Sequence, residues 1–227
     1  MDKTKKLHIT MLSDSHNSTH DVIIPEIPTD MTTVLIHAGD FSFKGKPAEI
    51  QDFIDWMSDQ PHDHKLWIPG NHELSLEDFP YNIEVIDNET GATCIHNKEI
   101  EIEGSRFFGS AMTPTFFNWA FMHDKEQAER YWEMAPDADI VVCHGPPMGI
   151  LDTISPEHPM ESLGCVSFRN YLERTKPKLA LWGHIHGGFG HETIKWDDGG
   201  ETECYNVAVM DENYDVRSEP AVTIEYQ

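Results

Sequence analysis

Five short, mainly apolar runs, each ending abruptly in a cluster of polar residues, constrain this chain more than any other feature of its sequence. The runs are Leu7–Ser13, Val34–His37, Leu66–Pro69, Ile140–Cys143 and Leu179–Trp182. Runs of this length and composition are typical of strands that are buried on both faces. Segments with helical periodicity lie between them, at Pro47–Ser58, His123–Glu133 and Ser167–Arg174. This alternation predicts an α/β chain with a largely parallel sheet.

Two other parts of the chain show a different strand pattern. In Ile83–Gly109, isoleucines alternate with polar residues and a turn at Gly104 precedes two phenylalanines, which predicts antiparallel strands. The tail segments Glu203–Met210 and Ala221–Tyr226 also have the composition of strands. Because no repeat, linker or change of composition interrupts the sequence, we expect residues 1–227 to form a single domain.

The charge balance excludes some classes of partner. The chain has 16 Lys and Arg residues against 40 Asp and Glu residues, which gives a net charge of −24. Such a surface repels polyphosphates at long range, so extended nucleic acid is a disfavoured partner. No apolar run approaches the roughly 20 residues of a membrane helix. The stretch after Lys6 is also too short for a signal peptide. We therefore expect a cytoplasmic chain without contact to a membrane.

Cysteine and histidine usage points to metal chemistry of a particular kind. The four cysteines lie far apart and form no Cys-x-x-Cys pair, which excludes a zinc ribbon or a thioredoxin-type motif. Without an export signal, we expect these thiols to be reduced. The chain has 14 histidines, and imidazole is the commonest ligand of transition metals.

The polar clusters at the strand ends have the composition of a metal site. They contain Asp14 and His16, Asp40, Asn71 and His72, His144, and His184 and His186. Taken singly, each cluster also fits a turn or a structural histidine. Their joint occurrence favours a shared site, because open α/β sheets place ligands beyond the carboxyl ends of their strands.

The mixture of side chains in these clusters suits two divalent ions. A pair of ions about 3.5–4 Å apart needs an anionic bridge, which a carboxylate provides. Imidazoles and an amide oxygen complete each coordination sphere while leaving net positive charge for a phosphate. Such a donor set suits Mn²⁺, Fe²⁺ or Zn²⁺ better than Ca²⁺ or Mg²⁺.

The order of these motifs resembles that of the calcineurin-like metallophosphoesterase superfamily. The five motifs are Asp14-x-His16, Gly39-Asp40, Gly70-Asn71-His72-Glu73, His144, and Gly183-His184-x-His186. Segments 37–41, 108–119 and 143–147, with 164–166, resemble more narrowly its small metallophosphoesterase-domain-containing subgroup, which includes brain-expressed animal proteins. The resemblance implies a sandwich of two packed mixed β-sheets flanked by helices, in four αββα layers.

The resemblance also implies a role for each motif residue. It assigns Asp14, His16 and His186 to one divalent ion, and Asn71, His144 and His184 to the other. Asp40 would bridge the two ions, of which Mn²⁺ is the expected identity and Fe²⁺ or Zn²⁺ the alternatives. His72 would not bind metal but would face the substrate phosphate and donate to the leaving oxygen. Asp40 and His72 are thus the expected catalytic residues.

Four functions remain open at this point. The leading hypothesis is a phosphodiesterase that hydrolyses small nucleotide-type esters, cyclic nucleotides among them, by attack of a hydroxide held between the metals. A phosphomonoesterase acting on phosphoprotein or nucleotide monophosphate would use the same ligands. A nuclease is disfavoured by the acidic charge. A metal-binding interaction scaffold without catalysis is disfavoured because every expected ligand and His72 are present.

Some residues outside the motifs carry weaker expectations. We expect His37 to pack under the site or to orient a ligand, and His191 to lie away from the substrate. Cys143, although next to His144, is not expected to be a nucleophile. An aromatic cluster could offer a stacking face for a nucleobase, but core packing is favoured for its members Phe116, Phe117, Trp119 and Phe121.

Overall fold

Each of the five apolar runs forms a strand of the protein. The computed structural model describes residues 6–154, 162–219 and 221–227. The runs become β1 (Leu7–Leu12), β2 (Thr32–His37), β3 (His64–Trp67), β9 (Ile140–Cys143) and β10 (Leu179–Trp182). Successive side chains of a strand point to opposite faces, and most side chains of these strands are buried because both faces of each sheet are covered. In β2, for example, Val34 and Ile36 pack in one core cluster and Leu35 packs in another.

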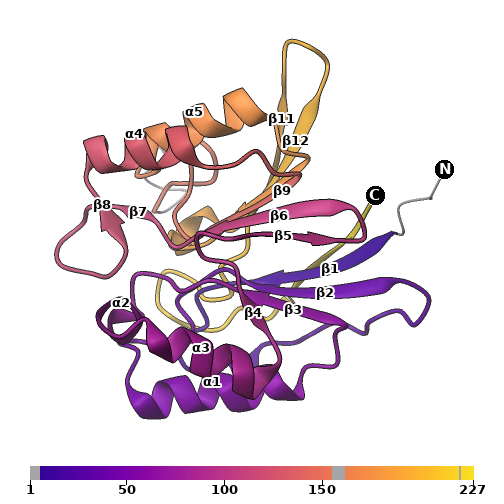
Figure 1. Ribbon diagram of the computed structural model, residues 1–227, viewed down its shortest axis with the longest axis vertical. Helices are drawn as coiled ribbons and strands as arrows, with labels where there is room; N and C mark the ends of the chain where they lie inside the picture. The colour runs from indigo at the N-terminus through magenta and orange to yellow at the C-terminus, as the bar shows by residue number, and fades with distance from the viewer. Residues whose placement is uncertain (1–5, 155–161, 220) are drawn as a thin grey trace.

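The strands belong to two mixed sheets that pack face to face (Figure 1). The first sheet has the order β13-β1-β2-β3-β4, with β4 at Thr93–Cys94 and the antiparallel β13 at Val222–Tyr226. The second has the order β11-β12-β10-β9-β6-β5, with antiparallel pairs at both edges. Its further strands are β5 (Glu99–Ile102), β6 (Ser105–Ser110), β11 (Gly190–Lys195) and β12 (Glu201–Asn206). A short parallel pair, β7 (Thr113–Pro114) and β8 (Met122–His123), stands apart.

Helices cover the outer face of each sheet (Figure 1). On the first sheet lie α1 (Pro47–Asp59), α2 (Leu74–Asp78) and α3 (Tyr81–Thr90), and on the second lie α4 (Lys125–Met134) and α5 (Val166–Thr175). The start of α4 is set by Asp124, whose carboxylate accepts the N–H of Gln127 at 2.8 Å while the Gln127 side chain accepts the N–H of Asp124 at 2.9 Å. Such a reciprocal cap pairs two N–H groups that the helix leaves free. Two 3-10 turns, Thr19–Asp21 and His186–Gly188, complete the helical elements of the described residues.

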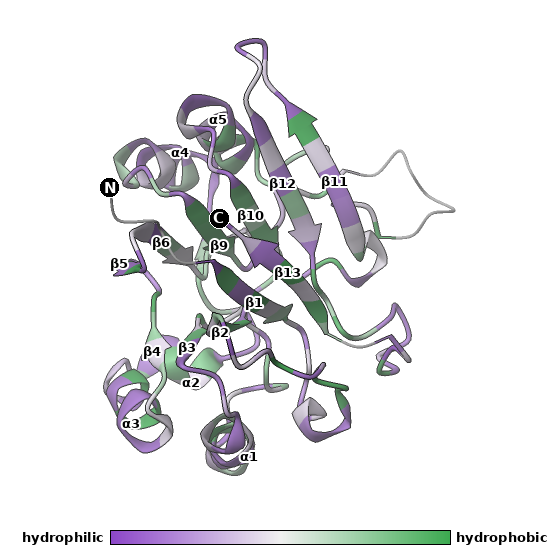
Figure 2. Cartoon of the chain, turned by 90° about the vertical axis from the view of Figure 1, so that its right-hand side faces the viewer, coloured by the Kyte–Doolittle hydropathy of each residue, from purple (hydrophilic) through white to green (hydrophobic). Residues whose placement is uncertain are grey.

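The core is divided into three layers by this architecture. One cluster lies between the sheets and includes Ile9, Ile36, Val142 and Leu181, each fully buried. The other two clusters fill the space between each sheet and its helices. Figure 2 shows the central strands of both sheets as hydrophobic and the helices with mixed faces. The predicted two-sheet sandwich flanked by helices is therefore confirmed.

The prediction for Ile83–Gly109 is wrong in its first part. Residues 81–90 form helix α3, and β4 joins the first sheet in parallel. Ile86 is buried against the α1 layer, and Gly91 ends the helix at a φ of 65°, a conformation that glycine adopts without strain. The remainder is confirmed, because β5 and β6 pair as an antiparallel hairpin.

In the described parts of the chain no helix is long and apolar enough to span a bilayer.

Candidate metal centre

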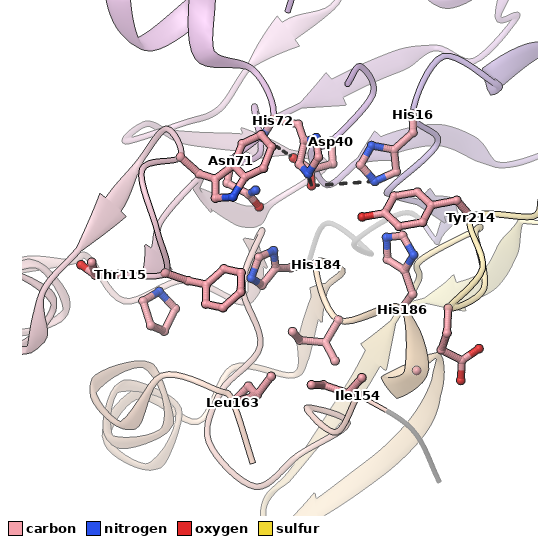
Figure 3. Close-up of a pocket in the computed structure, with 16 residues that line it drawn as sticks. His16, Asp40, Asn71, His72, Thr115, Ile154, Leu163, His184, His186 and Tyr214 are labelled. Carbon is pink, nitrogen blue, oxygen red and sulfur yellow. Dashed lines mark hydrogen bonds and ion pairs between the residues drawn. The ribbon is translucent and has the colours of Figure 1, made fainter. Parts of the chain in front are cut away.

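The carboxyl ends of five strands meet at one edge of the sandwich, and the motif residues meet there with them. Both sheets run their parallel strands toward this edge, so the loops after β1, β2, β3, β9 and β10 face one another. Figure 3 shows motif residues from four of these loops around one cavity: His16, Asp40, Asn71, His72, His184 and His186. Three groups of His and Asp side chains result, each with ligand atoms within 4.8 Å of one another. They are Asp14, His16 and His186; His16, Asp40 and His72; and Asp40, His144 and His184. Every residue in the two predicted ligand sets lies in this region, Asn71 included.

The loops that carry these residues are bent into conformations that side chains rarely adopt. Asp14, His16, Asp40 and His184 all have positive φ angles, between 39° and 65°. Backbone hydrogen bonds hold these turns: the N–H of His184 donates to both carboxylate oxygens of Asp14 at 2.9 and 3.0 Å. The N–H of His72 likewise donates to Asp40 Oδ1 at 2.8 Å. Strained backbone of this kind is concentrated at functional sites.

Glycines let the loops approach one another without a gap. A Cβ atom at Gly70 would lie 2.2 Å from Asp40 Oδ1 and 2.7 Å from His144 Cε1. At Gly183 it would lie 1.9 Å from Asp14 Oδ2. The motif glycines are therefore required by the close contact of loops from different strands.

Three imidazoles present the same nitrogen to the centre. The Nδ1 atoms of His16, His144 and His186 lie 3.1, 2.8 and 2.9 Å from the carbonyl oxygens of Ser42, Ala38 and Asp211, respectively. A carbonyl only accepts, so each Nδ1 carries a proton, and each Nε2 can offer its lone pair to a metal ion once any proton on it has been displaced. Backbone partners of this kind orient metal-bound histidines. His16 Nε2 is buried without a hydrogen-bond partner in the described structure, which costs free energy unless a cation binds it.

The group that contains Asp40 and His144, with Asn71 beside it, brings electron-pair donors together around one point. Both Asn71 Oδ1, at 3.0 Å, and Asp40 Oδ2, at 3.2 Å, face His144 Nε2. A proton or a cation must lie among these three atoms, because none of them has a hydrogen to share once His144 Nδ1 is bound to Ala38. The residues present therefore fit divalent metal binding in both of the predicted ligand sets.

The electrostatics of the centre follow from burial and opposite charge. Burial alone would raise the pKa of Asp40, but the nearby His144 outweighs it and holds that pKa well below its usual range. His186, with Nε2 3.4 Å from Asp14 Oδ1, likewise holds the pKa of Asp14 low against its burial. Burial would lower the pKa of His144, yet Asp40 raises it to about 9. Both carboxylates thus stay ionised and attract cations.

Glu73, which follows the third motif, ties two of the loops together. Its buried carboxylate accepts the N–H groups of Asp40 at 2.9 Å and Gly70 at 2.6 Å. It also accepts the N–H of Ser42 at 2.9 Å and the Ser42 hydroxyl at 2.7 Å. Burial and the charge of Asp40 raise the pKa of Glu73 to about 8, while these hydrogen bonds oppose the rise. The sequence indicated Glu73 as part of the motif without a role, and the structure shows that it anchors the Asp40 turn.

The centre opens into a cavity of about 410 Å³. Its lining includes His72 and Trp119, whose rings stack at 4.3 Å with an angle of 22° between their planes. Trp119 and Phe116 form part of an apolar wall, and none of the described lining residues is Lys or Arg. The favoured prediction of core packing is therefore wrong for Phe116 and Phe117, which are 57% and 82% exposed. They lie in the β7–β8 segment, outside the two sheets and their helix layers.

Other residues singled out in the sequence lie where their surroundings explain them. His37 is fully buried beneath the centre with Nε2 3.0 Å from the Ser15 hydroxyl, and burial lowers its pKa to about 3. His191 pairs with Glu203 on β12 and does not line the cavity. Cys143 is buried, and burial raises its pKa well above the ordinary value, which argues against a thiolate nucleophile.

Comparison with known proteins identifies the family to which these motifs belong. Residues 7–188 match the sequence profile of calcineurin-like phosphoesterases. The chain belongs to the calcineurin-like phosphoesterase family. Members of this family hydrolyse phosphoesters with metal ions, and the family implies a dinuclear divalent site, for which the His and Asp groups are the candidate ligands.

Relatives support membership in the calcineurin-like phosphoesterase family over most of the chain. Metallophosphoesterase domain-containing protein 1 of Homo sapiens is 33% identical over 235 residues, covering 93% of this chain and 68% of that protein. A Caenorhabditis elegans protein is 30% identical over 234 residues, covering 97% of this chain and 76% of its own length. Among solved structures, the protein TT1561 of Thermus thermophilus has the same fold, with a TM-score of 0.59 and 12% identity over 90% of this chain and 89% of that one.

Proposed function

We propose that this protein is a dinuclear metal-dependent phosphodiesterase acting on small nucleotide-type phosphodiesters, cyclic nucleotides among them. The observation that carries the proposal is where the centre opens. The two groups of His and Asp side chains that contain Asp40 lie at a cavity with aromatic walls, and none of its described lining residues is Lys or Arg. A diester bears one negative charge, whereas a monoester bears close to two at neutral pH. Glu212 in the lining adds a further negative charge, which disfavours the dianion.

The proposed ligands divide between the two ions according to the groups that the fold brings together. Asp40 is proposed as the bridge, and Mn²⁺ as the native ion. The remaining ligands are Asp14, His16 and His186 for one ion, and Asn71, His144 and His184 for the other. When bound, the two cations supply Lewis acidity and a water of lowered pKa that can attack phosphorus.

His72 is proposed as the residue that protonates the leaving oxygen. Its Nδ1 lies 2.9 Å from the carbonyl oxygen of Phe43, and Trp119 stacks on its ring, so the imidazole is held in one orientation. Its Nε2 lies 3.9 Å from Asp40 Oδ2, and its side chain is 14% exposed, at the boundary between the centre and the cavity. Because Nδ1 faces a carbonyl, His72 would act as an imidazolium, whose second proton, on Nε2, is within reach of an ester oxygen bound at the centre.

Steady-state kinetics with chromogenic esters test this function. We expect the protein loaded with Mn²⁺ to hydrolyse bis(p-nitrophenyl) phosphate with a higher kcat/KM than p-nitrophenyl phosphate, and to hydrolyse cyclic AMP or cyclic GMP. Asp40→Asn should lose bound metal and turnover, whereas Asp55→Asn, on the exposed face of α1, should retain both. A preference for the monoester, or no turnover of any of these esters, would contradict the proposal.

We also propose that the protein acts in the cytoplasm as one domain. The four cysteines are free and buried, which fits a reducing compartment. Both sheets contribute to the core cluster between them, so neither would retain its buried face alone. Calorimetry should therefore give a single unfolding transition, and cell fractionation should recover the protein with cytosolic markers. Two separate transitions, or recovery with an organelle, would contradict these two proposals.

A further inference from the structure

We propose that Tyr214 positions the substrate by donating a hydrogen bond from its phenol to a non-bridging phosphoryl oxygen at the metal centre. The inference rests on the proposed function in that a phosphoester must bind there. Tyr214 lies in the loop between β12 and β13, beyond residues 7–188, over which the chain matches its family. It belongs to none of the five motifs.

The position of the ring places the hydroxyl beside the proposed metal ligands. The centroid of the Tyr214 ring lies 5.1 Å from that of His16 and 4.9 Å from that of His186. The residue lines the cavity, and Figure 3 shows its hydroxyl directed into it. Within the described structure this hydroxyl makes no hydrogen bond to protein, and Tyr214 is 49% exposed. The donor is therefore free for a ligand.

The loop that carries Tyr214 is joined to one of the proposed ligands. The carbonyl oxygen of Asp211 accepts two hydrogen bonds, one from His186 Nδ1 at 2.9 Å and one from the N–H of Tyr214 at 3.1 Å. The Asp211 carboxylate also accepts the N–H groups of Asn213 at 2.8 Å and Asp215 at 3.0 Å. These bonds hold Tyr214 at a φ of 65°, which is costly for an aromatic residue. The turn thus fixes the phenol relative to His186.

The charges around the cavity explain why a phenol is useful at this position. A bound phosphate presents oxygen acceptors, and the described lining holds no Lys or Arg to pair with them. An ordinary tyrosine has a pKa of about 10 and is a neutral donor at pH 7. Tyr214 can therefore stabilise phosphoryl charge from the side of His16 and His186 without repelling the cations.

The variant Tyr214→Phe separates hydrogen bonding from packing, because it keeps the ring against His16 and His186. We expect unchanged Mn²⁺ content and melting temperature. The inhibition or dissociation constant of inorganic phosphate should rise about tenfold, and kcat/KM for bis(p-nitrophenyl) phosphate should fall roughly 10- to 100-fold, as for loss of one hydrogen bond to a charged group. The matched control is Tyr81→Phe in α3, where the ring is 64% exposed and outside the cavity lining; all four values should stay unchanged.

Two results would overturn the role of Tyr214. One is a Tyr214→Phe variant with the phosphate affinity and kcat/KM of the unmodified protein, which would show that the Tyr214 ring only packs against its neighbours. The other is loss of metal in that variant, which would make the phenol a support of the ligands. If the unmodified protein binds phosphate but turns over no ester, the phosphodiesterase proposal fails, and the phosphate constants of the two proteins still decide the role of Tyr214.

Discussion

The buried His37 makes the stability of the protein depend on pH in a way that can be calculated. The side chain is fully buried, with aromatic rings of Phe41, Phe53 and Trp56 around it, and burial lowers its pKa to about 3. In the unfolded chain the pKa of histidine is about 6.5. Below that pH the unfolded state binds a proton that the folded state does not, so stability is lost as the pH falls.

The size of the effect follows from the separation of the two pKa values. Each pH unit between them corresponds to about 1.36 kcal/mol. Between pH 7 and pH 5, where folded His37 stays neutral, its contribution to the free energy of unfolding falls by about 2 kcal/mol. His37→Gln removes the titration and retains a polar group that can reach the Ser15 hydroxyl, which His37 Nε2 contacts at 3.0 Å.

Urea unfolding of metal-free protein between pH 7 and pH 5 measures this contribution. The unmodified protein should lose about 2 kcal/mol more than His37→Gln over this range. His64→Gln, at an exposed site at the start of β3, should follow the unmodified protein. Parallel curves for His37→Gln and the unmodified protein would refute the reasoning. If the variant does not fold, NMR of the imidazole C–H protons decides instead, because His37 should not titrate above pH 4.

Three further substitutions test the centre and its cavity. His72→Gln should keep its metal and lose about 10²-fold or more in kcat, as measured by metal analysis and diester hydrolysis, because a general acid is removed. Gly70→Ala should lose bound metal by the same analysis, since its Cβ would lie 2.2 Å from Asp40 Oδ1. Phe116→Ser should raise KM for a cyclic nucleotide about tenfold with little change in kcat, because base stacking contributes roughly 1–3 kcal/mol.

A glycine and a phenylalanine outside the centre provide controls for two of these substitutions. Gly200→Ala should keep its metal, because the nearest atom to its Cβ, 3.3 Å away, belongs to the exposed carboxylate of Asp198, which can shift and lies outside the centre. Phe117→Ser should leave KM unchanged, since Phe117 is 82% exposed and does not line the cavity. Full activity of His72→Gln, normal metal content in Gly70→Ala, or equal KM values for the two phenylalanine variants would each contradict the corresponding role.

The strand ends could be predicted from sequence because their signal is local. Ile140–Cys143 and Leu179–Trp182 are short apolar runs that stop at polar residues, and the structure has both strands with these bounds. The convergence of the motif residues then follows from parallel topology, since parallel strands end at one edge. Helix α3 has the sequence pattern of a strand because Ile83, Val85 and Ile86 are β-branched, and tertiary packing of Ile86 overrides that preference.

Features that depend on contacts between distant loops could not be predicted in this way. Phe116 and Trp119 have the composition of a core segment, and only the placement of β7 and β8 outside the layers exposes Phe116 and brings both to the cavity. Tyr214 follows no strand run and no motif, and its contact with His16 links residues from opposite ends of the chain. No periodicity marks such a contact, because periodicity reports only which face of an element is buried.

Anomalous X-ray diffraction from crystals of Mn²⁺-loaded protein tests the dinuclear centre most directly. We predict two manganese peaks about 3.5–4 Å apart, one on each side of the Asp40 carboxylate. One peak should lie against His16 and His186 and the other against His144 and His184. A single peak, or peaks that do not share Asp40, would contradict the proposed arrangement.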